Sequence, residues 1–310
     1  MNAVKRFRAG GEQRLTDLTI RRAMTAVLIL FASAVVAQTP MIPQSLYEAP
    51  EQQSKADLAT ILVEAQRESL KRQVRNFVSA IATQRFGDSL ARWEKPTTIC
   101  PQVAGLPRAE GEFVLARLSQ IAVIAGAPLG AEHCRPNFYV IVTEKPDELV
   151  KGMEKKHPDM YGNGYYTLIR KFQSAASPIR VWYNAELYDD DGRRLPGSAS
   201  GTASHIKFSS MRDLKSVFVI VDTQRVRGSG VTFGQIAAYI AMVGLAELRS
   251  DPKIGKAPTI LSVFSNSEKE RPPGLTSWDQ AYLKALYHTA HWDRMQLAEI
   301  RTSLVRDLVP

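Results

Sequence analysis

The amino-acid sequence predicts an α+β fold, in which a small mixed sheet packs on helices and the C-terminal part of the chain is helical. The first observation is the apolar, β-branched run Val217–Val221, which is typical of a strand covered on both faces. The second is the nearly uncharged segment 232–249, where Thr232 and Gln235 have the spacing of a capping box. The third is the order of elements along the chain, which is helix, strand, helices, strands, helix and further helices.

Residues 1–37 have the features of a secretory signal peptide. Two arginines precede the apolar run Ala23–Val36, which is short for a membrane span, and small residues lie at the −3 and −1 positions before Gln38. We therefore expect cleavage between Ala37 and Gln38 and a periplasmic or secreted protein. Two alternatives stay open: the leader is retained as an inner-membrane anchor facing the periplasm, or translation starts at Met24.

The composition is that of a globular protein. Hydrophobic residues make up 45% of the 310 residues, and the mean hydropathy is −0.18, which excludes a polytopic membrane protein and a disordered chain. The net charge of +9 does not indicate nucleic-acid binding, because residues 1–37 hold six Lys and Arg against two acids. We expect membrane contact only through the leader, if it is uncleaved.

The next two segments are a linker and a long helix. Residues 38–53 are polar and rich in proline, which is typical of a tether. Residues 54–86 predict an amphipathic helix, with Ser54 and Asp57 at capping-box spacing. Its apolar residues are Leu58, Ile61, Leu62, Ala65, Val74, Phe77, Val78 and Ile81. This face packs either on the rest of the chain, which is the simpler expectation, or on a partner.

Residues 93–310 predict a single domain, with a sheet-bearing part at about 93–249 and a helical part at about 250–310. Periodicity and turn signals predict its elements. Asp191 and Gly192 indicate a hairpin turn, and residues 223–230 indicate a polar loop. Strands are expected at 138–142, 179–188, within 198–208 and at 217–221. Helices are expected at about 109–125, 146–157, 165–173, 232–249, 276–287 and 291–308.

The two cysteines, Cys100 and Cys134, agree with export. An even number of cysteines in an oxidising compartment favours a disulfide. Such a bridge would stabilise the fold by roughly 3–4 kcal/mol on chain-entropy grounds. Two unpaired buried thiols are the alternative, whereas a metal site lacks the usual closely spaced ligands.

The sequence contains no HExxH, GxSxG, P-loop or GxGxxG motif. His288 and His291 are three residues apart and are weak candidates for a shared metal ion, although no third ligand lies nearby. His205 has the chemistry of a general base, but the sequence ties no nucleophile or acid to it. We therefore predict no cofactor and no metal.

Aromatic residues gather between the glycines at 162 and 164. Tyr161, Tyr165 and Tyr166 form a candidate contact loop that is suited to line a glycan or peptide groove. Packing within the loop is the alternative.

The order of elements resembles the zincin metalloprotease fold. The segment Ala241–Leu245 is similar to the end of the zincin active-site helix, where a ligand histidine precedes Gly-Leu. This resemblance implies that the ligand, base and ligand positions fall on Ala237, Ala238 and Ala241, none of which can bind zinc or accept a proton. The range 93–287 also resembles a group of exported alphaproteobacterial proteins of unknown role.

Together these observations predict a catalytically inactive, zincin-like binding or scaffolding module of the cell envelope. Its partner is expected to be an envelope protein or peptide that the sequence does not identify, and nucleic acid is not expected. The contact surfaces would be the helix 55–85 and the loop 161–166. The alternative is a hydrolase whose site is assembled from His205, His288, His291 and distant acids.

Overall fold

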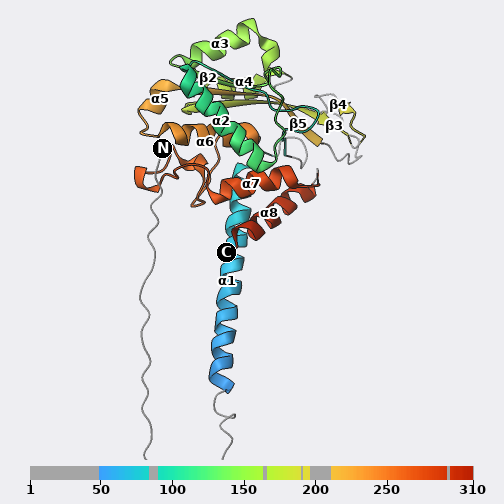
Figure 1. Cartoon of the computed structure of the whole chain (residues 1–310), viewed down its shortest axis with the longest axis vertical. Helices are drawn as coiled ribbons and strands as arrows, with labels where there is room; N and C mark the ends of the chain where they lie inside the picture. Colours follow the sequence, from blue (N-terminus) through green and yellow to red (C-terminus); the bar gives the residue numbers. More distant parts are fainter. Residues whose placement is uncertain are drawn as a thin grey trace, which may run out of the picture. The chain divides into compact units, whose positions relative to one another are not determined.

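The α+β prediction is confirmed by a computed structural model, which describes residues 49–83, 90–162, 166–189, 191–195, 211–291 and 294–309. The chain divides into two units, Met1–Ser54 and Lys55–Pro310, and the sheet belongs to the second (Figure 1). The predicted signal peptide, the cleavage site Ala37–Gln38 and the linker up to residue 48 lie outside the described residues. Among the described residues, no helix is both long and apolar enough to cross a lipid bilayer.

The described residues form one mixed sheet of five strands in the order β1-β2-β5-β3-β4. Three neighbouring strands run parallel, namely β1 (Pro101–Ala104), β2 (Phe138–Thr143) and β5 (Met211–Asp222). Two run antiparallel to their neighbours, namely β3 (Ile179–Tyr188) and β4 (Arg194–Leu195). The limits predicted for β3 are confirmed. The sequence did not predict β1, because a four-residue edge strand that begins with proline has almost no periodicity to detect.

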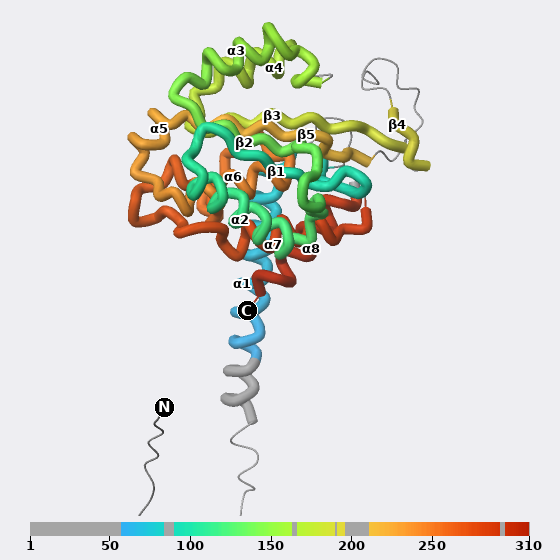
Figure 2. Tube along the Cα trace, turned by 45° about the horizontal axis from the view of Figure 1, so that its top comes forward, coloured from blue at the N-terminus to red at the C-terminus, as the bar shows by residue number. Residues whose placement is uncertain are grey.

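The sheet is covered on both faces, as the β-branched run of β5 indicates. Val217, Val219 and Val221 belong to the larger hydrophobic core, whereas Phe218 and Ile220 point to a smaller one on the other face. Figure 2 shows α3 and α4 over one face and α2, α6 and α7 over the other. These helices are α2 (Arg108–Ala125), α3 (Pro146–Lys156), α4 (Tyr166–Gln173), α6 (Phe233–Leu245) and α7 (Ser277–His288).

Helix α6 lies at the centre of the larger core. The predicted capping box of Thr232 and Gln235 is confirmed at its start. The helix ends at Leu245 rather than near residue 249, because the backbone of Ala246 is extended. Gly244 is required near its end, since a Cβ atom there would collide with the ring of Phe138.

Two elements differ from the expected pattern. Residues 223–230 begin as a short helix, α5 (Thr223–Arg227), instead of a loop, because the Asp222 carboxylate accepts hydrogen bonds from the N–H groups of Gln224 and Arg225. The partner strand expected within 198–208 lies outside the described residues. In its place, β4 pairs with β3 directly after the Asp191-Gly192 turn.

The C-terminal part is helical, as predicted. Thr276 and Asp279 form a capping box at the start of α7. Helix α8 (Arg294–Leu308) follows, and its Leu297, Ile300 and Leu304 are buried in the larger core. The connections contain the short 3-10 helices η2 (Pro158–Tyr161), η3 (Ile260–Ser262) and η4 (Glu268–Glu270).

The long N-terminal helix, α1, spans Ala49–Ile81 rather than 54–86. Ser54 and Asp57 therefore lie inside the helix and do not cap it. Pro50 is compatible with the first turn, because N–H groups there have no partner within the helix.

Candidate functional site

The predicted disulfide is present. Cys100 and Cys134 are joined, with their Cα atoms 5.9 Å apart. The bridge links the residue before β1 to the loop that leads into β2. It thereby ties together two segments at the amino ends of adjacent parallel strands.

The three positions that the zincin resemblance singles out lie in the protein interior. Ala237, Ala238 and Ala241 are all buried in the larger core. At these positions α6 packs against other elements and presents no functional group to solvent. The helix therefore serves as a packing element at these three positions.

Two of the three candidate histidines are described, and both lie on the surface. His288 and His291 are exposed at the end of α7 and the start of the following loop. The Nδ1 atom of His288 lies 2.8 Å from the carbonyl oxygen of Lys284, one turn back in the same helix. His205 lies outside the described residues. Within the part of the chain that is described, no group of three His, Cys, Asp or Glu side chains is arranged to hold a metal ion.

The predicted tyrosine loop divides into a buried and an exposed part. Tyr161 is buried, with its ring edge-on to Trp182, and its hydroxyl group donates to the carbonyl oxygen of Val150. Burial raises the pKa of Tyr161 to about 12. Tyr166 is exposed and carries the Arg170 guanidinium over its ring. Tyr165 lies outside the described residues. Of the two tyrosines that are described, Tyr166 is the exposed one.

A crevice opens at the carboxyl ends of β2 and β5, where chemistry is expected in sheets of this kind. The chain leaves β2 towards α3 on one face and leaves β5 towards α6 on the other, which is the arrangement of a topological switch point. The crevice has a volume of about 500 Å³ and is lined by Glu144, Lys145, Pro146, Asp147, Glu148, Arg180, Asp222, Gln224 and Arg225.

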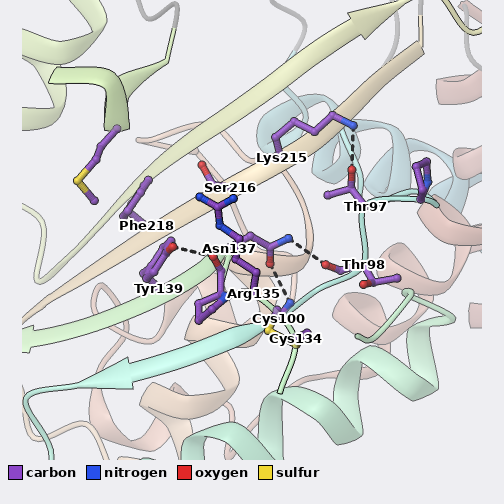
Figure 3. A pocket seen from close by; sticks show the side chains of 13 residues that line it. Thr97, Thr98, Cys100, Cys134, Arg135, Asn137, Tyr139, Lys215, Ser216 and Phe218 are labelled. Atoms are coloured by element: carbon purple, nitrogen blue, oxygen red, sulfur yellow. Dashed lines mark hydrogen bonds between the residues drawn. A yellow bond between two sulfur atoms is a disulfide. The ribbon is translucent and has the colours of Figure 1, made fainter. Parts of the chain in front are cut away.

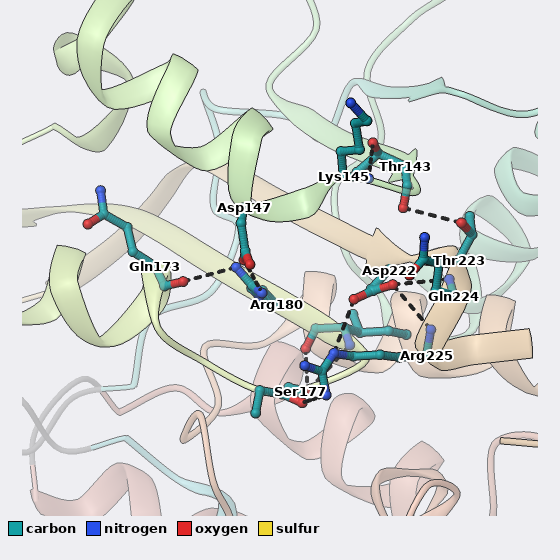
Figure 4. A network of polar contacts seen from close by, with 12 residues as sticks. Thr143, Lys145, Asp147, Gln173, Ser177, Arg180, Asp222, Thr223, Gln224 and Arg225 are labelled. Atoms are coloured by element: carbon teal, nitrogen blue, oxygen red, sulfur yellow. Dashed lines mark hydrogen bonds and ion pairs between the residues drawn. The ribbon is translucent and has the colours of Figure 1, made fainter. Parts of the chain in front are cut away.

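The charged groups of this crevice are all in ion pairs, most of them with one another, as Figure 4 shows for its centre. The Arg180 guanidinium lies 2.6 Å from the Asp147 carboxylate and also donates to the carbonyl oxygen of Gln173. The hydrogen bond from Arg180 holds the pKa of Asp147 below its ordinary value. Arg225 lies 3.2 Å from Asp222. The Asp147–Arg180 pair ties α3 to β3, and the Asp222–Arg225 pair holds the first turn of α5 to the end of β5.

The exposed surface that stands out most is the first half of α1, residues 57–68. Every residue of this stretch is exposed. Four of them are large and apolar: Leu58 is 58% exposed, Ile61 59%, Leu62 62% and Val63 62%. Monomeric proteins rarely leave such side chains together in solvent, so this docking half of α1 is the best candidate for an interaction site.

The apolar side chains of the docking half lie on two sides of the helix. At 3.6 residues per turn, Leu58, Ile61, Leu62 and Ala65 share one stripe. Val63 instead continues the stripe that is buried further along the helix, about 150° away. The single apolar face expected from the sequence is therefore wrong: the exposed group at 58–65 and the buried group at 74–81 lie on different sides of the helix.

No protein-family model, curated protein or solved structure that was compared with the chain matches it.

Proposed function

We propose that the chain is an exported, zincin-like binding or scaffolding module of the cell envelope, without peptidase chemistry. Its docking half of α1 engages a partner protein. The leader and the disulfide Cys100–Cys134 support export, and the alanines at the zincin ligand positions support the absence of peptidase chemistry.

The observation that carries the proposal is the exposure of four large apolar side chains on one uncovered stretch of helix. A helix of about three turns that contributes no side chain to a hydrophobic core is marginally stable in water, and among the described residues the docking half contributes none. Full burial of a Leu or Ile side chain gains roughly 1.5–3 kcal/mol. A partner that covers this stretch would therefore gain binding energy and would hold it helical.

The partner that fits best is a protein with an apolar groove that receives the helix. A stable flat interface uses about 20–30 residues a side, whereas the stripe of Leu58, Ile61, Leu62 and Ala65 offers four. A groove would also cover Val63 on the opposite side. Residues at i, i+3, i+4 and i+7 are the anchors of helix-in-groove recognition.

A site-specific photo-crosslinker tests this proposal in the envelope of the producing cell. The photo-reactive residue is placed at Leu62, at Val63 and, as a control, at the exposed Arg193 of the β3–β4 turn. We expect an adduct of the same mass from positions 62 and 63, none from 193, and loss of both on the additional change Leu58→Glu.

Other patterns would contradict the groove model. An adduct from only one of the two positions means a flat contact, and an adduct of twice the chain's own mass means a second copy. Absence of any adduct removes the docking proposal. The proposed absence of peptidase chemistry is tested separately, by measuring the zinc content and the casein cleavage of the purified mature chain. Close to one equivalent of bound zinc, or metal-dependent cleavage, would contradict it.

The hydrolase alternative is not proposed. The described contacts of His288 and His291 are with neighbouring groups at helix ends, and none of them favours a catalytic role.

A further inference from the structure

A second hollow lies at the opposite end of the parallel strands from the crevice. It is formed by residues 96–98, by the loop 134–137 and by the face of β2 and β5 that α3 and α4 cover. Its volume of about 520 Å³ is in the range of small-molecule sites. Figure 3 shows Lys215 and Thr97 at one end of this hollow, Tyr139 and Phe218 at the other, and Arg135 between them in that view.

The charge of this hollow is positive. The residues that line it include two cations, Arg135 and Lys215, and no acid. Lys215 is already engaged, because its Nζ atom lies 2.9 Å from the Thr97 hydroxyl and 3.5 Å from the Asp213 carboxylate. Arg135, in contrast, has no hydrogen bond or ion pair with any described residue. Its guanidinium is therefore the uncompensated charge of the hollow.

The backbone around Arg135 is held on both sides. The preceding residue, Cys134, is joined to Cys100 by the disulfide. Two residues further on, the Asn137 side chain accepts from the Cys100 N–H at 2.8 Å and donates to the Thr98 carbonyl oxygen at 2.9 Å. A binding group on such a fixed loop loses little backbone entropy when a ligand arrives.

The other end of the hollow is aromatic and apolar. Tyr139 and Phe218 stack with their ring centroids 4.9 Å apart and their planes at 7°. Met160, at the end of η2, also lines this region. Ser216 offers a hydroxyl hydrogen, because its oxygen accepts from the Asn184 side chain and the hydroxyl donates no hydrogen bond to a described residue.

We propose that this hollow binds an organic oxyanion, a carboxylate or phosphate monoester carried on a flat or apolar body. Arg135 holds the oxyanion through its paired N–H groups, and Ser216 donates a further hydrogen bond. The apolar body lies against Tyr139 and Met160. This site is separate from the docking half of α1, and neither proposal depends on the other.

Calorimetric titration of the full mature chain tests the site with four probes. Phenyl phosphate and benzoate carry both an oxyanion and a ring, inorganic phosphate carries only the charge, and benzyl alcohol carries only the ring. We expect saturable one-to-one binding of at least one ring-bearing anion, and binding at least about tenfold weaker for inorganic phosphate and for benzyl alcohol. If phenyl phosphate binds more tightly, the ligand is a phosphate monoester, and if benzoate binds more tightly, it is a carboxylate.

Variants locate the binding. Arg135→Gln should lower the affinity for the ring-bearing anion about tenfold or more, and Ser216→Ala should lower that affinity severalfold. Arg108→Gln is the matched control, because this side chain is 91% exposed at the start of α2, away from the hollow. It should leave the affinity unchanged. Arg135 is exposed, so its variant should keep the wild-type unfolding temperature.

Three results would overturn the proposal. The first is equal affinity in wild type and Arg135→Gln, and the second is an equal loss in Arg108→Gln, which would indicate unspecific charge attraction. The third is absence of saturable binding for both ring-bearing anions.

Discussion

The two halves of α1 carry apolar residues at the same spacing, i, i+3, i+4 and i+7, but in opposite environments. In the docking half, Leu62 is 62% exposed, whereas in the second half, residues 69–81, Phe77 is 1% exposed. The second half is covered by residues far away in the chain: Phe77 packs edge-on to Trp278 and Tyr282, and Arg301 donates to Ser79. An apolar periodicity thus shows that a helix has a face to bury, but not what covers that face.

The difference also separates two kinds of stability. The second half of α1 is part of the larger core, so its side chains contribute to global unfolding. No side chain of the docking half belongs to either hydrophobic core of the described residues, so its helix depends largely on local propensity and side-chain pairs. Four predictions test this division, in order of decreasing expected effect.

Phe77→Ala should have the largest effect. Removing this buried ring leaves a cavity beside Trp278 and Tyr282 and should lower the free energy of unfolding by about 3–5 kcal/mol. Urea denaturation of the purified chain measures the loss. A loss below about 1 kcal/mol would mean that the second half of α1 is not part of the cooperative core.

A pair of glycine substitutions should separate local from global stability. Ala80→Gly, in the second half, should lower the global free energy of unfolding by about 0.5–1 kcal/mol. Ala65→Gly carries the same intrinsic penalty but should act locally, by speeding amide hydrogen exchange at residues 57–68 without shifting the urea midpoint. Equal shifts of the midpoint in both variants would show that the docking half is covered by the rest of the chain.

Leu62→Ala should hardly change the stability of the free chain. Because this side chain has no core contact to lose, the free energy of unfolding should stay within about 0.5 kcal/mol of wild type. The same urea experiment as for Phe77→Ala provides the comparison. A loss of several kcal/mol in the free energy of unfolding would show that the stripe of Leu58, Ile61, Leu62 and Ala65 is buried in solution.

The smallest effect concerns an ion pair at the end of the docking half. A hydrogen bond from Lys71, together with its charge, holds the pKa of Glu68 below its ordinary value of 4.5. Since the pKa is lower in the helix than in the unfolded chain, the local stabilisation is present above about pH 4.5 and is lost as the pH falls through the lowered pKa.

Carbon-13 NMR titration of the Glu68 carboxyl group measures this shift. Lys71→Met should return the pKa to its ordinary value, while Arg67→Met, whose charge contributes less, should change it little. An unshifted Glu68 in the wild-type chain would show that the pair does not form in solution.

Local signals account for the parts of the fold that the sequence predicted well. The limits of β3 and the capping box of α6 both follow from residues within a few positions of each other. The disulfide was also predictable, because two cysteines allow only one intramolecular pair. The edge strand β1 was missed, because it is defined by its pairing with β2, which lies more than 30 residues further along the chain. The short helix α5 was missed, because its start depends on the single capping side chain of Asp222.

The sequence by itself determined the fold class, most helices and strands, the disulfide pairing, and the expectation of a leader at residues 1–37. Only the tertiary structure decided which half of α1 is covered, that Tyr161 is buried, and that Arg135 and Lys215 line one hollow. The physical reason is the range of the interactions. Backbone hydrogen bonds and periodicity are encoded within a few residues, whereas burial and pocket formation depend on which distant surfaces meet when the chain folds.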